Sequence, residues 1–186
     1  MLNTILGSLS AGAGAATSYE SIATVTVGAG GAASIEFTSI PSTYTHLQIR
    51  GIGTCTRNIG TMDLNITFNS DTGANYSRHQ LKGDGASATA AGSANLSDMQ
   101  MNSPIPNSTN TSIYAGLVLD ILDYTNTNKY KTMRILVGSD LNGSGQIILG
   151  SGNWRNTNAV TSVKFTPETF NWAQYSQFAL YGIKGA

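Results

Sequence analysis

The stretch MDLNITF, residues 62–68, indicates the fold class, because its hydrophobic side chains recur at every second position. Hydrophobic residues occupy positions 62, 64, 66 and 68, whereas polar residues occupy positions 63, 65 and 67. Successive side chains of a β-strand point to opposite faces of the sheet. This period of two therefore predicts a strand with one buried face and one solvated face.

Similar runs recur along the chain, rich in the β-branched and aromatic residues that favour strands and separated by turns rich in Gly and Asn. The expected strands are Ile22–Val27, Ser34–Ile40, His46–Cys55, Met62–Phe68, Ile113–Tyr124, Tyr130–Ser139, Gln146–Trp154, Val160–Phe165 and Tyr175–Ile183. Only Ile113–Tyr124 is ambiguous, because GLVLDILDY within it also fits a short buried helix. Short strands without a long helical period predict an all-β antiparallel sandwich or barrel, and of these we expect a jelly-roll-like sandwich.

Residues 1–18 are predicted to form an N-terminal arm that precedes a sandwich domain of residues 19–186. Four apolar residues of the arm follow the spacing of one helical face: Leu2, Ile5, Leu6 and Leu9. So short a helix is marginal by itself, and the flexible tether AGAGAATS follows it. We expect the apolar face to dock onto a neighbouring subunit. The alternative is a loose terminus or a strip folded back on its own domain.

Residues 83–112 contain mostly small and polar residues, which predicts a long connecting loop. Loops of this length in compact domains are usually functional or disordered. Met99, Met101 and Ile105 lie in its middle and are candidate interface residues.

Charged residues make up only 11% of the 186 residues, and ten basic side chains balance ten acidic ones. Ordinary soluble domains carry about 25% charged residues. This balance argues against nucleic acid or an anionic membrane as a partner. No apolar run approaches the ~20 residues that span a bilayer. Cys55 is the only cysteine, so it excludes an intramolecular disulfide and a Cys-based zinc site, and we expect it to be buried.

The glycine-rich and acidic turn motifs predict no cofactor and no metal. GAGGAA at residues 28–33 fits a dinucleotide fingerprint, but a strand follows it where a helix is required. Asp140, Asn142 and Ser144 resemble half of a calcium loop, but Ser151 stands where the bidentate glutamate belongs. Both motifs are therefore expected to be turns.

The titratable side chains likewise predict no enzyme. His46 and His79 are expected to be isolated histidines on surface strands, and no nucleophile elbow accompanies them. Asp120 and Asp123 lie three residues apart in an apolar run without an evident cationic partner. No pair of carboxylates is placed for glycoside hydrolysis.

Four aromatic residues near the C-terminal end form a further candidate site: Trp154, Phe170, Trp172 and Tyr175. Such rings usually fill a core or an interface. The alternative is a platform on which the faces of sugar rings stack, which would bind a glycan.

Several segments resemble small virion proteins of tailed bacteriophages, including cyanophages. The segments are SYESIATVTVGAGGAASIEFTSIPSTYTHLQIRGIG at residues 18–53, FNSDTGANYSRHQLKGDG at 68–85, LGSGNWRNTNAVTSVKF at 149–165 and YSQFALYGI at 175–183. The resemblance covers roughly residues 18–184 and leaves the arm outside it. It implies a β-sandwich in a virion and assigns no binding residues.

The resemblance and the composition together lead us to expect a non-enzymatic phage structural protein, assembled in the host cytoplasm and located in the particle. Within that class we expect a capsid decoration (cement) protein, without a cofactor, that binds the major capsid protein and copies of itself as a homotrimer. The alternative is a tail-fibre or receptor-binding module that recognises a host-surface glycan.

Overall fold

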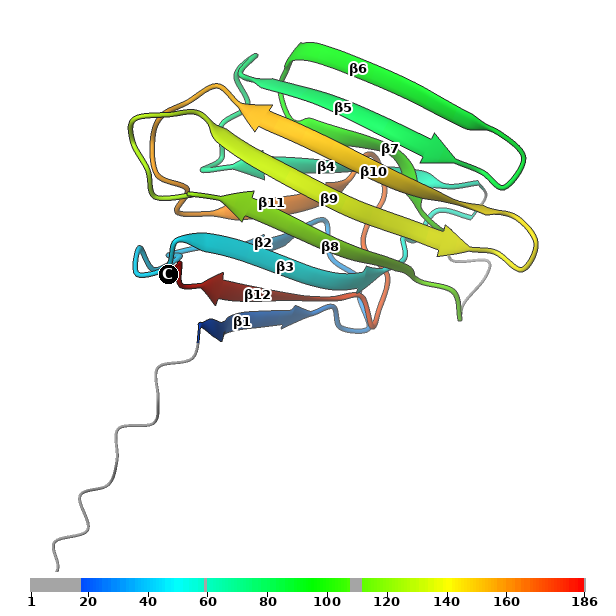
Figure 1. The fold of residues 1–186 in the computed structure, drawn as a ribbon. Helices are drawn as coiled ribbons and strands as arrows, with labels where there is room; N and C mark the ends of the chain where they lie inside the picture. The colour runs from blue at the N-terminus through cyan, green and yellow to red at the C-terminus, as the bar shows by residue number, and fades with distance from the viewer. Residues whose placement is uncertain (1–17, 59, 108–111, 186) are drawn as a thin grey trace, which may run out of the picture.

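The computed structural model of the chain describes residues 18–58, 60–107 and 112–185, and every regular element in these ranges is a β-strand. The strands form two antiparallel sheets that pack face to face (Figure 1). The prediction of an all-β antiparallel sandwich is therefore confirmed. The arm residues Leu2, Ile5, Leu6 and Leu9 lie outside the described residues, and β1 begins at Tyr19.

The strands are distributed unequally between the two sheets. The larger sheet has eight strands in the spatial order β1 (Tyr19–Thr26), β12 (Gln177–Ile183), β3 (His46–Gly53), β8 (Ala115–Leu122), β9 (Lys131–Asp140), β10 (Gly145–Trp154), β5 (Tyr76–Gly83) and β6 (Ala88–Leu96). The smaller sheet has four strands in the order β2 (Ile35–Phe37), β11 (Val163–Pro167), β4 (Met62–Phe68) and β7 (Met99–Ile105). Because β8, β9 and β10 follow one another in sequence and in space, they form a meander in the middle of the larger sheet (Figure 1).

The core lies between the two sheets and is built by the alternation that the sequence predicts. In β4, Met62, Leu64, Ile66 and Phe68 are fully buried, whereas the polar residues between them are only partly buried. Cys55 is also fully buried, and this burial raises the pKa of its thiol. Both findings agree with the sequence-based expectations.

The prediction of a long loop at residues 83–112 is wrong, because both β6 and β7 lie within this range. β5 and β6 form a hairpin, in which Asp84 accepts hydrogen bonds from the backbone N–H groups of Ala86 (2.9 Å) and Ser87 (2.7 Å). β7 then crosses to the smaller sheet and pairs with β4. The ambiguous run Ile113–Tyr124 contains a strand, β8, and no helix.

Met99 and Met101 of β7 fill two notches on the inner face of the larger sheet, which are left by glycines of β10. A Cβ atom at Gly152 would lie 2.4 Å from the sulfur of Met99, and one at Gly150 would lie 2.6 Å from the sulfur of Met101. Both methionines and Ile105 are fully buried. The three candidate interface residues therefore contact the core of their own domain.

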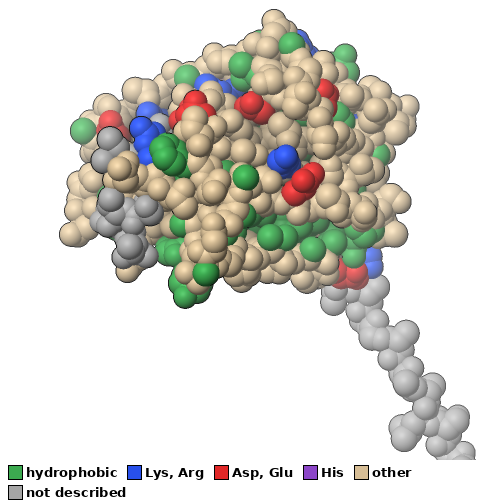
Figure 2. Space-filling model, turned by 180° about the vertical axis from the view of Figure 1, so that it is seen from behind, with side chains coloured by type: hydrophobic (Ala, Val, Ile, Leu, Met, Phe, Trp, Pro, Cys, Tyr) green, Lys and Arg blue, Asp and Glu red, His purple; other side chains and the backbone are tan. Residues whose placement is uncertain are grey.

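Eight strands extend further than four can cover, so both margins of the larger sheet project beyond the smaller one. At one margin, Ile22, Ala23 and Val25 of β1 pack against the core but are only partly buried. Figure 2 shows hydrophobic side chains gathered on this side of the rear face, close to the point where the chain enters β1. At the other margin, most residues of β6 are exposed on both faces of the strand.

The hydrogen bond between Trp154 and Asp71 ties the turn that precedes β5 to the end of β10. The indole Nε1 donates to Oδ2 of Asp71 at 2.7 Å. Burial acts to raise the pKa of Asp71, but hydrogen bonds from Trp154, Gly73 and Asn75 outweigh it and leave this pKa below the ordinary value of 3.8. The unfolded chain then binds the proton more tightly. Stabilisation by Asp71 is therefore complete above pH 3.8 and is lost as the pH falls through the folded-state pKa.

Replacing Trp154 with phenylalanine is expected to lower the free energy of unfolding in a pH-dependent way. A hydrogen bond to a charged acceptor contributes about 1.5–3 kcal/mol, so this part of the loss should appear at neutral pH and fade as the pH falls from 3.8 through the lowered pKa of Asp71. Denaturant unfolding across this pH range measures the change. The matched control is Trp172→Phe, because Trp172 is also fully buried but donates to the uncharged carbonyl of Phe165 at 3.0 Å. Losses with the same pH dependence in both variants would contradict a specific role of the Asp71 carboxylate.

Candidate functional site

The outer face of the larger sheet is the candidate site, because it presents large hydrophobic side chains that the described residues leave exposed. Alternation sends every second residue of β8, β9, β10 and β5 inward to the core and the others outward. The exposed large hydrophobic residues among the outward ones are Val118, Leu122, Leu136, Leu149, Leu81 and Ile147, between 38% and 57% exposed. Monomeric proteins rarely expose contiguous apolar patches unless they serve a purpose.

Strand register aligns four of these side chains in a single row, which we call the leucine ridge: Val118, Leu136, Leu149 and Leu81. Each residue of the ridge lies directly opposite the next one on the neighbouring strand, and Leu81 in turn faces Ala90 of β6. Five strands spaced about 4.8 Å apart make this row roughly 19 Å long. The ridge is therefore continuous across the middle of the sheet.

A shallow hollow of about 610 Å³ flanks the ridge on the side of the turn between β9 and β10. Gly116 and Gly138 face each other on neighbouring strands and form its floor, because neither has a side chain. Ile147 lies opposite Gly138 and borders the hollow. We call this depression the glycine hollow, and its shape could accept an apolar side chain of a partner.

The turn between β9 and β10 at the edge of the glycine hollow is well defined. Asn142 and Gly143 both have positive φ, 62° and 97°, which is typical of a two-residue hairpin turn. The backbone N–H of Leu141 donates to the carbonyl oxygen of Ser144 at 2.7 Å. The segment that resembles half of a calcium loop is therefore a hairpin turn, as predicted.

A second shallow hollow of about 590 Å³ flanks the ridge on its other side, and its lining is more apolar than that of the glycine hollow. Arg134, Ser151 and His79 lie in one cross-strand row beside it. A Cβ atom at Gly92 would lie 2.7 Å from the ring of His79, so the ring sits in the space that this glycine leaves. The ridge thus separates two shallow hollows, of which the one beside His79 has the more apolar lining.

The charged groups beside the ridge belong to one network of an ion pair and hydrogen bonds. Arg134 forms an ion pair with Asp120, with 2.9 Å between Nη2 and Oδ2. Gln48 donates to the other oxygen of Asp120 at 2.8 Å and accepts from Arg50 at 3.0 Å. A partner that covers the ridge would therefore meet an apolar row bordered by paired charges.

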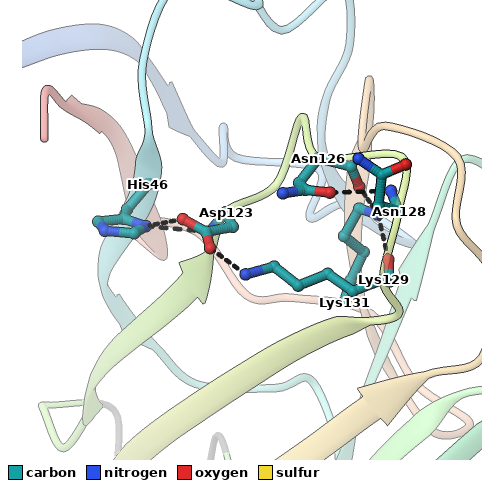
Figure 3. Close-up of polar contacts among 6 residues, drawn as sticks. All are labelled: His46, Asp123, Asn126, Asn128, Lys129 and Lys131. Atoms are coloured by element: carbon teal, nitrogen blue, oxygen red, sulfur yellow. Dashed lines mark hydrogen bonds and ion pairs between the residues drawn. The ribbon is translucent and has the colours of Figure 1, made fainter.

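Asp123 and His46 are not the isolated groups that the sequence suggested (Figure 3). The backbone N–H of Asp123 donates to Nδ1 of His46 at 2.9 Å, and the Asp123 carboxylate forms an ion pair with Lys129. The hydrogen bond that Lys129 donates to the Asp123 carboxylate, together with the charge of Lys129, holds the pKa of Asp123 below its ordinary value. The prediction that Asp120 and Asp123 lack cationic partners is wrong, because their partners come from β9 and from the turn before it.

Lys131 binds the backbone of the same turn from the interior of the domain (Figure 3). Its side chain is fully buried, and Nζ donates to the backbone carbonyls of Asn126 (2.5 Å), Thr157 (2.9 Å) and Lys129 (3.0 Å). Burial, with a smaller contribution from the charge of Lys129, lowers the pKa of Lys131. The three carbonyl acceptors offset part of the cost of burying this ammonium group.

The four candidate aromatic residues divide into two buried rings and two exposed ones. Trp154 and Trp172 are core side chains, whereas Phe170 is 43% exposed and Tyr175 is 65% exposed. Trp172 packs against Phe178 with ring centroids 5.1 Å apart, and it covers Gly53. The four rings therefore do not form one platform at the surface.

The described residues suggest neither a metal site nor a membrane-spanning helix. Among residues 18–58, 60–107 and 112–185, no three His, Cys, Asp or Glu side chains are grouped closely enough to hold a metal ion. The same residues contain no helix that is long and apolar enough to cross a membrane.

Comparisons with known proteins assign no relative. No family model matches the chain, and neither the curated proteins nor the solved structures contain a match. We therefore infer the function from the sequence and from the geometry of the domain.

Proposed function

We propose that the protein is a non-enzymatic structural protein of a tailed-phage particle, and more narrowly a decoration protein that stabilises the head shell. The observation that carries this proposal is the leucine ridge, an exposed apolar row on the outer face of the larger sheet with the Arg134–Asp120 ion pair beside it. The low charge of the whole chain and the resemblance to phage virion proteins also support it. In this proposal the larger sheet lies on the major capsid protein.

The outer face is large enough for a stable contact of this kind. Eight strands spaced by about 4.8 Å, each about 25 Å long, present roughly 850 Å². A standard protein interface buries about 800 Å² per partner. Half-exposed side chains such as Leu149 and Leu81 would each contribute about 1 kcal/mol on complete burial. Contact across two capsid subunits would then oppose their separation.

Further copies of the chain are the second proposed partner, with a homotrimer at a three-fold point of the shell. A closed ring satisfies identical contacts in every subunit. The apolar residues of the arm, from Leu2 to Leu9, remain predicted contacts in this assembly. The mass of the free protein in solution measures the oligomer.

The leading alternative, a receptor-binding module that recognises a host glycan, has less support. It was motivated by four neighbouring rings, of which only Phe170 and Tyr175 are exposed. Binding of the protein to host-surface glycan, without binding to shells, would favour this alternative.

Replacing Leu149 with aspartate is expected to abolish binding to undecorated shells while the domain stays folded. Leu149 is 52% exposed, so the change removes little core packing but places a charge in the middle of the ridge. Burying an unpaired carboxylate against the shell costs several kcal/mol, which corresponds to a loss of affinity of about a hundredfold or more. Occupancy after cosedimentation with undecorated shells measures the effect.

The matched control is Thr38→Asp, which adds the same charge to an exposed position just after β2 of the smaller sheet, away from the outer face of the larger sheet. This variant should bind like the unchanged protein, and both variants should show the same circular dichroism. Equal occupancy by Leu149→Asp and the unchanged protein would contradict the role of the ridge.

A further inference from the structure

β6 forms an open edge of the larger sheet, because among the described strands it pairs only with β5. It lies at the upper margin of the sheet in Figure 1 and projects beyond the smaller sheet. An edge strand presents unpaired N–H and C=O groups to which another strand can bind. Natural proteins usually protect such edges with charges, proline, bulges or short strands.

The other three edge strands carry such protection. β2 has only three residues, and β7 contains Pro104 and faces a register shift between Met62 and Leu64 of β4. β1 has a register shift between Ser21 and Ala23. β6 contrasts with all three.

The sequence of β6 contains no charged residue and no proline: ATAAGSANL, residues 88–96. Its pairing with β5 is regular from Ala88 to Ala94, and the register shifts only beyond Ala94. Ala88 to Gly92 are all exposed, and both faces of the strand are open to solvent. Neither side chains nor a covering element would therefore hinder the approach of another strand.

The amino-acid sequence of the regular part of β6 reads nearly the same in both directions from Ala91. With Ala91 opposite its own copy, Ala90 faces Gly92, Thr89 faces Ser93, and Ala88 faces Ala94. Every such pair joins residues of similar size, and the Thr–Ser pair can form a cross-strand hydrogen bond. Antiparallel pairing about a two-fold axis requires this kind of self-complementarity.

We infer that β6 pairs with β6 of a second copy of the chain, antiparallel and centred on Ala91, so that two larger sheets join into one continuous sheet. This contact does not depend on the proposed binding to a shell. Where a three-fold ring also forms, the two-fold contact joins one ring to the next.

The test measures mass against concentration by analytical ultracentrifugation of the full chain, without shells. The mass of the unchanged protein should rise at least twofold from its value at high dilution. Ala91→Lys places two ammonium groups directly opposite each other. The dimer of this variant should therefore associate at least about tenfold more weakly than that of the unchanged protein. Thr132→Lys, on an exposed position away from the edge, should associate like the unchanged protein. A constant mass of the unchanged protein, or equal association of Ala91→Lys, would overturn the inference.

A second variant reports the register. In Ala91→Cys the two new thiols would lie opposite each other across the two-fold axis, so mild oxidation should give a disulfide-linked dimer. Cys55 is buried and does not compete. Thr132→Cys, also exposed, should cross-link at least tenfold more slowly (an order-of-magnitude expectation). Cross-linking of both variants at the same rate would contradict pairing centred on Ala91.

Discussion

Replacing Gly152 with valine is expected to lower the free energy of unfolding by about 3 kcal/mol, at the upper end of the range for overpacked cores. A Cβ atom at this position would lie 2.4 Å from the sulfur of Met99 and 3.1 Å from Cγ of Met133. The methyl groups of valine would need still more room between the two sheets. Chemical denaturation at equilibrium measures the loss.

Two further variants separate steric overlap from other effects of the glycine. Gly116→Val, on the outer face of the same sheet, has nothing within 4 Å of a Cβ atom, so it should change stability by less than about 0.5 kcal/mol. Met99→Ala should partly rescue Gly152→Val, because truncation of Met99 frees the space that valine needs. Additive losses in the double variant would contradict the account of the notch.

Replacing Lys131 with methionine is expected to lower the free energy of unfolding by about 3 kcal/mol. Methionine keeps the aliphatic packing, but it leaves the carbonyls of Asn126, Lys129 and Thr157 without their shared donor. Each buried polar group that loses its partner costs about 1–3 kcal/mol, and water can reach some of these after relaxation of the turn. Thermal and denaturant unfolding measure the change.

Lys129→Met on the same turn is the matched control. Its ammonium group forms an ion pair with Asp123 but is 54% exposed, and exposed pairs contribute about 0–1 kcal/mol. The backbone carbonyl that Lys131 uses is unaffected by this change. A loss as large in Lys129→Met as in Lys131→Met would contradict the distinction between the surface pair and the buried ammonium.

Most strands that the sequence predicted bury one face in the core, but β5, which also buries one face, is not among the nine expected strands. MDLNITF alternates because β4 packs one face against the larger sheet. β6 has no such pattern, because it projects beyond the smaller sheet and buries neither face. β7 does alternate at Met99 and Met101, but Pro104 and the polar residues around it favoured a loop. Gly150 and Gly152 of β10 leave the space that the two methionines fill, and the sequence prediction did not use them as evidence that β7 is a core strand.

The leucine ridge could have been found from apolar triplets in three successive predicted strands. LVL at residues 117–119, ILV at 135–137 and IIL at 147–149 each place an apolar residue on both faces of a strand. One face must then remain outside the core. The ion pairs of Asp120 and Asp123, in contrast, depend on strand register and turn geometry, which residue types alone do not specify.

The location and orientation of the protein in the intact particle test the proposed function most directly. Electron cryomicroscopy of the particle would resolve both. Our proposal predicts the protein on the head shell, with the outer face of the larger sheet against the major capsid protein and Leu81, Leu136 and Leu149 covered. A location at the tail, or a head-bound protein whose leucine ridge faces solvent, would contradict it.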